Sequence, residues 1–278
     1  MNLICAFVPT NRKGGVDILE ASIMRQNFKP THLIVADELA EERMYIWNSL
    51  KNRFIEQNID LYVFKPEQTI RNAARNLVAA YNQGVDYCRS IGYGDDDLFI
   101  SLQDYIWVPE NGIERFAILN VAAPDALLTG VTDISLDPFI TSIEDKEGLY
   151  TIFKEPYTDK PSRILWEDPR PRSIYNTKQN KIINIDPEHW EANWAAVPFK
   201  LFNLGARWTE IYDTGYAYEN IDFALRCRHD FGAQILMDAE NCVISLPHKE
   251  YWQNEVEDLQ KFNNFISDLE RLVEDKLK

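Results

Sequence analysis

Four short apolar runs alternate with segments of helical spacing in the first 120 residues, and this alternation constrains the fold more than any other feature. Short apolar runs bounded by turn residues are typical of buried strands. The β-α-β-α order predicts an α/β fold with a largely parallel central sheet flanked by helices. The predicted strands cover residues 3–8, 31–36, 60–64 and 98–102, and the predicted helices cover 16–26, 41–57, 68–81 and 110–119.

The fourth apolar run ends on a cluster of polar side chains. Three carboxylates precede it at residues 95–97, and Gln103, Asp104 and Tyr105 follow it. Open α/β sheets bind their ligands at the carboxyl ends of the strands. We therefore expect Asp104 to lie at the centre of the functional site.

The second half of the chain gives a weaker pattern. Residues 133–187 are rich in Asp, Pro, Lys and Arg, which indicates a loop or an insertion. The charges of residues 254–278 favour a closing amphipathic helix. Further strands are predicted at 126–131, 234–237 and 242–246, and further helices at 190–204 and 215–228.

Charge and hydropathy narrow the class of protein. A net charge of −15 argues against a broad, non-specific nucleic-acid surface, which needs clustered Lys and Arg. No apolar run reaches the roughly 18 to 20 residues of a membrane span, and the apolar N-terminus lacks a basic leader. The four cysteines have no metal-like or CxxC spacing. We expect a cytoplasmic protein without a membrane segment, and reduced, structural cysteines.

Several ordered motifs resemble those of the family 2 glycosyltransferases with the GT-A fold. The likeness covers roughly residues 3–248, and its strength lies in the order and spacing of matches that are weak singly. The matches are Pro9-Thr10-Asn11-Arg12 after the first strand, Ser22 to Gln26, Asp37-Glu38, Asn72 to Asn76, Leu102-Gln103-Asp104-Tyr105-Ile106-Trp107-Val108-Pro109, Gly205, Gly215 to Arg226, and Pro247-His248.

The resemblance implies a GT-A-like, Rossmann-like sheet with an acceptor-side insertion. It implies one catalytic domain over residues 1–250, with a nucleotide-sugar-binding half at 1–120 and an acceptor-binding half at 121–250, followed by the helix that ends the chain at 251–278. The implied activity is transfer of a sugar from a nucleoside-diphosphate sugar, with a UDP-sugar favoured, to an acceptor hydroxyl with inversion.

The resemblance also implies the site residues. A divalent metal, Mn²⁺ or Mg²⁺, would be held by Asp104 and His248, since carboxylate, imidazole, diphosphate and water suit these ions. Donor binding is assigned to Pro9, Thr10, Asn11, Arg12, Asp37, Asn72, Arg75, Gln103 and Asp104.

Two departures from the family pattern affect the chemistry. Gln103 and Tyr105 stand where the DxD motif has flanking carboxylates, so metal dependence is an open question. The family takes the acceptor proton with the Asp of its "ED" pair, and that position is Asn220, which cannot act as a base. Glu219 and Asp222 flank it, and we favour Glu219 as the base; Asp222 could instead cap its helix.

Two other classes of function compete with this one. A degenerate GT-A module would bind a nucleotide sugar or glycan without turnover. A nucleotidyltransferase would use residues 11–15 as a phosphate loop, but leaves residues 219–226 without a role.

The acceptor is unknown. A basic cluster could face a phosphate-bearing polymer or modified DNA, although a solvated loop explains it more simply, and Trp166 or Trp194 could stack on a sugar. The cluster comprises Lys160, Arg163, Arg170 and Arg172.

Overall fold

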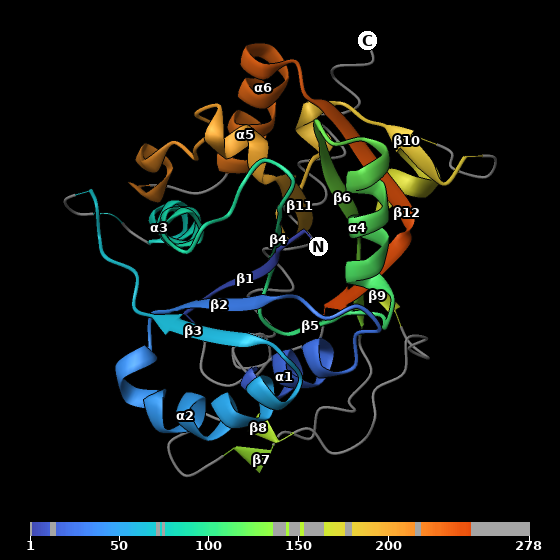
Figure 1. Cartoon of the computed structure of the whole chain (residues 1–278). Coiled ribbons are helices and arrows are strands. Elements are labelled where there is room, and N and C mark those ends of the chain that lie inside the picture. Colours follow the sequence, from blue (N-terminus) through green and yellow to red (C-terminus); the bar gives the residue numbers. More distant parts are fainter. Residues whose placement is uncertain are drawn as a thin grey trace.

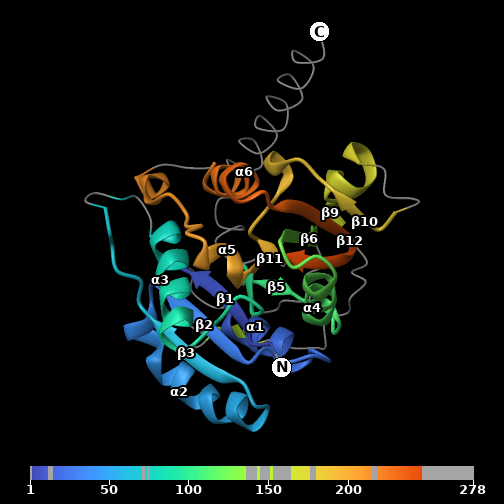
Figure 2. The ribbon, with the colours of Figure 1, turned by 45° about the horizontal axis from the view of Figure 1, so that its top comes forward.

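A computed structural model gives the arrangement of the chain (Figure 1). Its central feature is a sheet that runs through the whole molecule, with helices on both faces (Figures 1 and 2). The structure describes residues 2–11, 15–70, 73, 76–135, 143–144, 151–152, 164–175, 180–214 and 218–245.

The main sheet has ten strands, eight of which follow the order β10-β12-β6-β11-β4-β1-β2-β3. β5 pairs with β12, and β9 pairs with β6. β7 (Ile143–Glu144) and β8 (Thr151–Ile152) form a separate two-stranded ladder. The ten strands are β1 (Ile4–Thr10), β2 (His32–Asp37), β3 (Asp60–Phe64), β4 (Leu98–Leu102), β5 (Ile106–Trp107), β6 (Ala126–Ser135), β9 (Ile164–Trp166), β10 (Ile182–Asn184), β11 (Trp194–Pro198) and β12 (Gln234–Ser245).

The strand directions confirm the prediction of a largely parallel sheet. β3, β2, β1 and β4 are mutually parallel, and β12 runs parallel to β6. β11 lies between β4 and β6 and is antiparallel to both. The first residues of β11 therefore lie beside the last residues of β4, at the edge where the predicted ligand site falls.

Two apolar cores cover the two faces of the sheet, because side chains alternate along each strand. Ala6 and Val8 of β1 face a core shared with α1 (Val16–Met24), α2 (Ala40–Glu56) and α4 (Gly112–Ala122). Cys5 and Phe7 face the core shared with α3 (Leu77–Ser90), α5 (Phe199–Asn203) and α6 (Glu219–Phe231). All four cysteines are free, as predicted.

Several predicted boundaries are wrong. The helix predicted at 68–81 begins at Leu77 and continues to Ser90. Residues 190–204 form β11 and the short α5 rather than one helix, because the apolar run at 194–198 is fully buried between two strands. The strands predicted at 234–237 and 242–246 are one bulged strand, β12. The predicted helix 254–278 lies outside the described residues.

Where it is described, the segment predicted as an insertion, 133–187, contains only short elements after the end of β6. After β9 come a π-helical turn (Arg170–Ile174), β10 and a 3₁₀ turn (Pro187–His189). The proposed division into halves at residue 120 stays a prediction, since the sheet takes strands from both. No helix in the described ranges is both long and apolar enough to cross a membrane.

Candidate functional site

Two polar side chains from neighbouring strands meet at the carboxyl edge of the sheet. Thr10 is the last residue of β1, and Asp104 follows β4 by two positions. The Thr10 hydroxyl donates to Asp104 Oδ2 over 2.7 Å, and both residues are buried. Asp104 therefore lies where the sequence predicts it, held in one orientation by the adjacent strand.

A fully buried ion pair lies next to this contact. Asp37, at the end of β2, accepts from Arg43 Nε at 2.6 Å and from Arg43 Nη2 at 2.7 Å. Trp47 Nε1 and the amide of Leu39 also donate to the Asp37 carboxylate. Both Asp37 oxygens are thus engaged within the protein, so the predicted direct contact with a nucleotide would have to compete with these four bonds.

The ion pair extends to the Asp104 contact through Arg43. Arg43 Nη2 lies 3.4 Å from Thr10 Oγ1, the same hydroxyl that donates to Asp104. The backbone of Arg43 leaves helical geometry, with φ −117° and ψ 18°, where α2 is kinked. Sequence reasoning missed this residue, because an arginine among Glu41 and Glu42 on a polar helix is typical of a solvated face.

The turn after Asp104 is fixed by a close aromatic contact. Tyr105 has a left-handed φ of 57°, which is uncommon for a residue with a side chain. Its ring covers Gly15, where an added Cβ would come within 2.8 Å of the ring. Gly15 itself has φ 78° and is the N-cap residue of α1. The loop after β1 and the turn after β4 therefore fit each other only with glycine at this position.

The Ser22 to Gln26 motif has a structural function. The Ser22 hydroxyl donates to the carbonyl of Ile106 at 2.9 Å, and Gln26 Nε2 donates to the carbonyl of Pro109 at 3.0 Å. Gln26 Oε1 accepts from the amide of Ile113 at the start of α4. These buried contacts fasten α1 to the segment that leaves the site.

Gln103 connects the site to β11. Its backbone amide donates to the carbonyl of Asn193 at 3.0 Å, and its side-chain amide donates to Asn193 Oδ1 at 2.6 Å. Ser101 donates to the carbonyl of Ala192 at 2.6 Å. Residues 191–193 thus lie along the same edge, a proximity that the sequence prediction of a helix over 190–204 missed.

α6 begins at Glu219, which is 7% exposed. Phe223 follows one turn later and stacks on Trp208 with ring centroids 4.0 Å apart. Trp208 stacks on Tyr81, whose hydroxyl bonds Ser101 of β4. Because residues i and i+4 share a helix face, Glu219 faces the same side as Phe223.

Asp222 occupies a different face of α6. Its Oδ2 accepts from Thr209 at 2.7 Å and from Arg226 Nε at 2.9 Å. Asn220, between the two candidate bases, has a buried Oδ1 without a hydrogen-bond partner among the described residues. The structure thus ties Asp222 to its own helix and to the preceding loop.

The N-terminus of α3 is closed by a carboxylate. Asp213, 1% exposed, accepts from the amides of Val78 and Ala79, both at 2.9 Å. These amides would otherwise be a ready binding site for an anion. Asp213 therefore caps the N-terminus of α3 and joins the turn Glu210–Thr214 to it.

Four predicted site residues, Arg12, Asn72, Arg75 and His248, lie outside the described residues. Within the described ranges, no group of three or more His, Cys, Asp or Glu side chains could hold a metal ion. Mg²⁺ and similar ions often bind through one or two carboxylates together with substrate phosphates and water. Asp104 at the sheet edge suits that arrangement, in which the diphosphate supplies part of the ligand set.

Two cations of the predicted basic cluster form ion pairs within the chain, one buried and one at the surface. Arg170 is buried against Asp168, with its Nε 2.9 Å from Asp168 Oδ2, and it also donates to the carbonyls of Gly130 and His189. Arg172 pairs with Glu167. Lys160 and Arg163 lie outside the described residues. Trp194 is 1% exposed and packs in the core against Phe116, so a sugar cannot stack on it without repacking of that core.

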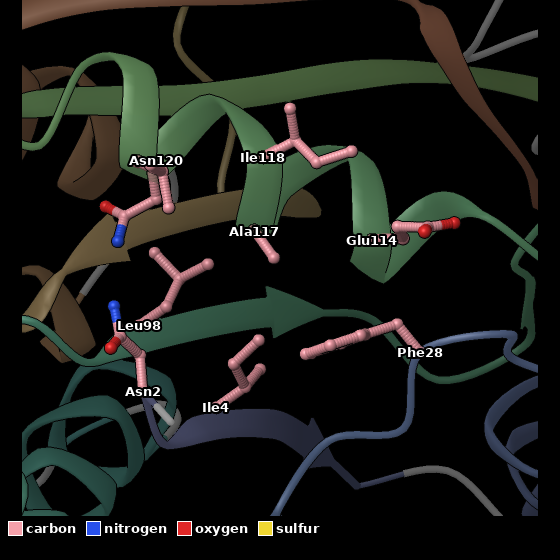
Figure 3. Close-up of a pocket in the computed structure, with 9 residues that line it drawn as sticks. Asn2, Ile4, Phe28, Leu98, Glu114, Ala117, Ile118 and Asn120 are labelled. Atoms are coloured by element: carbon pink, nitrogen blue, oxygen red, sulfur yellow. The ribbon is translucent and has the colours of Figure 1, made fainter.

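A cavity of about 320 Å³ lies away from this edge, beneath α4 (Figure 3). Its lining includes Ile4 and Leu98, the first residues of β1 and β4, so it lies at the amino ends of these strands. Ile118 of α4 also belongs to its lining and is largely exposed. None of the predicted site residues lines this cavity.

No protein-family model and no curated protein matches the sequence. Solved structures do match. The crystal structure of GalNAc-T7 with UDP, GalNAc and Mn²⁺ aligns with a TM-score of 0.57 and 13% identity, over 89% of this chain and 44% of that one. The chain has a GT-A-like fold. Staphylococcus aureus TarS 1–349 in complex with UDP-GlcNAc aligns with a TM-score of 0.54 and 9% identity, over 89% of this chain and 59% of that one. The chain thus spans about half of each matched chain.

Proposed function

We propose that this GT-A-like protein is a glycosyltransferase that moves a sugar from a nucleoside-diphosphate sugar to an acceptor hydroxyl, with inversion. The observation that carries the proposal is the buried carboxylate of Asp104 at the carboxyl edge of the sheet, fixed by Thr10 from the next strand. Ligands of open α/β sheets bind at this edge. Both matched structures contain UDP or a UDP-sugar, which makes UDP the favoured nucleotide.

The donor would lie across the ends of β1, β2 and β4. Pro9 and Thr10 at the end of β1, with Asn11 after them, would face the nucleoside together with Arg12, Asn72 and Arg75. Asp37 would act by holding Arg43 and, through it, Thr10. The turn after Gln103 would face the diphosphate, while the side-chain amide of Gln103 remains hydrogen-bonded to Asn193.

Charge stabilisation of the leaving diphosphate is the main physical task. A divalent ion, Mn²⁺ or Mg²⁺, held by Asp104 and His248 would neutralise the charge that develops on the diphosphate. The role of Thr10 is to keep the Asp104 carboxylate oriented toward the edge. The ring of Tyr105, the next residue, packs on Gly15 and fixes the turn that carries this carboxylate.

Glu219 is the proposed general base, which would take the proton of the attacking hydroxyl. The side chain lies on the α6 face that leads, through Phe223 and Trp208, to β4. Asp222 is a weaker candidate because its Oδ2 is bound by Thr209 and Arg226. A single displacement with Glu219 as base leads to inversion at the transferred carbon.

A second candidate function is binding of a nucleotide sugar without turnover. It is favoured by the neutral residues at the DxD flanks, since the Gln103 amide is committed to Asn193 and Tyr105 packs on Gly15. Asn220, at the position of the family base, supports it as well. A phosphate-bearing acceptor has little support, because Arg170 and Arg172 are paired with neighbouring carboxylates.

Calorimetric titration with UDP, GDP, CDP and TDP, each with and without Mn²⁺, tests donor binding. We expect one nucleotide to bind, and Asp104→Asn to weaken it at least tenfold, because the carboxylate charge is lost. Asp96→Asn is the matched control, an exposed aspartate at the amino end of β4, and should bind like wild type. Absence of binding by all four nucleotides would overturn the proposed function.

Donor hydrolysis and transfer separate an enzyme from a binding module. With the bound nucleotide as its sugar derivative, we expect turnover that falls at least a hundredfold in Glu219→Gln, in line with typical general-base contributions of 10²–10⁴. Asp222→Asn should retain most of the turnover. If Asp222→Asn alone abolished activity, the base assignment would reverse, and no hydrolysis by wild type would favour the module.

A further inference from the structure

Beside Asp104, on the side away from the nucleotide loop, lies a carboxylate that the motifs do not include. β11 is antiparallel to β4 with Trp194 opposite Leu102, so residues just before β11 adjoin residues just after β4. The bonds of Ser101 to Ala192 and of Gln103 to Asn193 fix this segment at the edge. Glu191 is the residue that precedes these two anchored positions.

The Glu191 carboxylate is accessible to solvent, and the guanidinium of Arg170 lies near it. Its side chain is 41% exposed, and Oε2 lies 3.8 Å from Arg170 Nη2. That guanidinium is already bound in a bidentate manner by Asp168 and donates to two backbone carbonyls. Burial raises the pKa of the Glu191 carboxyl, the charges of Arg170 and His189 lower it, and the charge of Asp168 raises it.

The order of the strand ends gives this carboxylate a position along the donor. Thr10 of β1, Asp104 of β4 and Glu191 before β11 follow one another across the edge. A nucleoside-diphosphate sugar is linear, with the diphosphate between its two ends. If the nucleoside lies at β1 and β2 and the diphosphate at Asp104, the sugar lies over the start of β11.

We infer that Glu191 binds hydroxyl groups of the donor sugar and selects neutral sugars over uronic acids. The inference rests on the proposed function. An ionised carboxylate accepts two sugar hydroxyls in strong, charge-assisted hydrogen bonds. The same charge, with Asp168 near it, repels a carboxylate on the sugar ring.

The test compares two donors that differ only at C6, UDP-glucose and UDP-glucuronate, with UDP alone as the reference. We expect wild type to bind UDP-glucose at least tenfold more tightly than UDP-glucuronate. Glu191→Gln keeps the size of the side chain and removes its charge. In this variant the ratio should fall at least fivefold, while the affinity for UDP stays within twofold of wild type.

Glu188→Gln is the matched charge control, since Glu188 is an exposed glutamate three residues earlier, and it should keep the wild-type ratio. Thermal melting of both variants checks that they fold. A Glu191→Gln variant with unchanged UDP binding and an unchanged donor ratio would overturn this inference alone. Failure of wild type to bind any of the four nucleotides would overturn the proposed function and this inference with it.

Discussion

Two buried aspartate–arginine pairs flank the end of β4, and they are built differently. Asp37 and Arg43 are both 0% exposed and join a strand to a helix. Asp168 and Arg170 are two residues apart and bind mainly the backbone around them, including the carbonyls of Gly130 and His189. The first pair fastens regular elements together, whereas the second shapes an irregular loop.

Each pair supports an acidic side chain at the edge. Arg43 reaches Thr10, which orients Asp104 on the proposed diphosphate side. Arg170 lies 3.8 Å from Glu191 on the proposed sugar side. The proposed nucleotide side is therefore fixed by the sheet and its helices, whereas the proposed sugar side depends on segments that are held by local contacts.

Breaking the first pair should have the largest effect. Arg43→Met leaves the buried Asp37 carboxylate without its cation, a change that typically costs about 3–5 kcal/mol of stability. Urea unfolding measures the loss. Arg228→Met serves as the control, because Arg228 is half-exposed and lies 3.9 Å from Asp186, and it should cost less than about 1 kcal/mol. A loss below about 1 kcal/mol in Arg43→Met would show that the pair does not hold β2 and α2 together.

Breaking the second pair should cost less. In Arg170→Met, Asp168 keeps the backbone amides of Thr132 and of residue 170 as donors. The loop around it can open locally without unfolding the sheet, which limits the global loss to about 1–3 kcal/mol. Urea unfolding of the two methionine variants side by side gives the ranking. A larger loss for Arg170→Met would contradict the distinction between the two sides.

The regular side was also the more predictable one. The strands and helices up to residue 64 and the position of Asp104 follow from apolar periodicity and from the rule that ligands bind at carboxyl ends. The start of α3 did not, because its first amides are bound by Asp213, 135 residues away from Val78. No local pattern contains that contact.

Predictions on the irregular side failed for a related reason. Trp194 to Val197 form a continuous apolar run, which has the same appearance in a buried strand as in a buried helix. With a helix predicted over 190–204, nothing in the sequence distinguished Glu191 from an ordinary charged residue in the first turn of a helix. Its proximity to Asp104 depends on the antiparallel pairing of β11 with β4, which cannot be obtained from spacing in the sequence.

The smallest expected effect is a pH dependence on the Asp37 side, carried by Glu38. Burial raises the pKa of the Glu38 carboxyl, and Asp37 and Asp213 raise it further; a hydrogen bond with Asn76 and the charge of Lys65 oppose the shift. The folded protein therefore keeps this proton to a higher pH than the unfolded chain does. Stability should fall as pH rises from the ordinary glutamate pKa through the raised one.

Glu38→Gln removes the titration and should flatten that decline. The variant should match wild type near pH 4 and be the more stable of the two near pH 7, because the wild-type carboxylate is ionised there in a partly buried, acidic position. Urea unfolding across this range measures the difference, with Glu67→Gln, an exposed glutamate, as the control that keeps the wild-type slope. If Glu38→Gln were less stable than wild type at pH 7, the ionised carboxylate would be a favourable partner of Lys65 and Asn76.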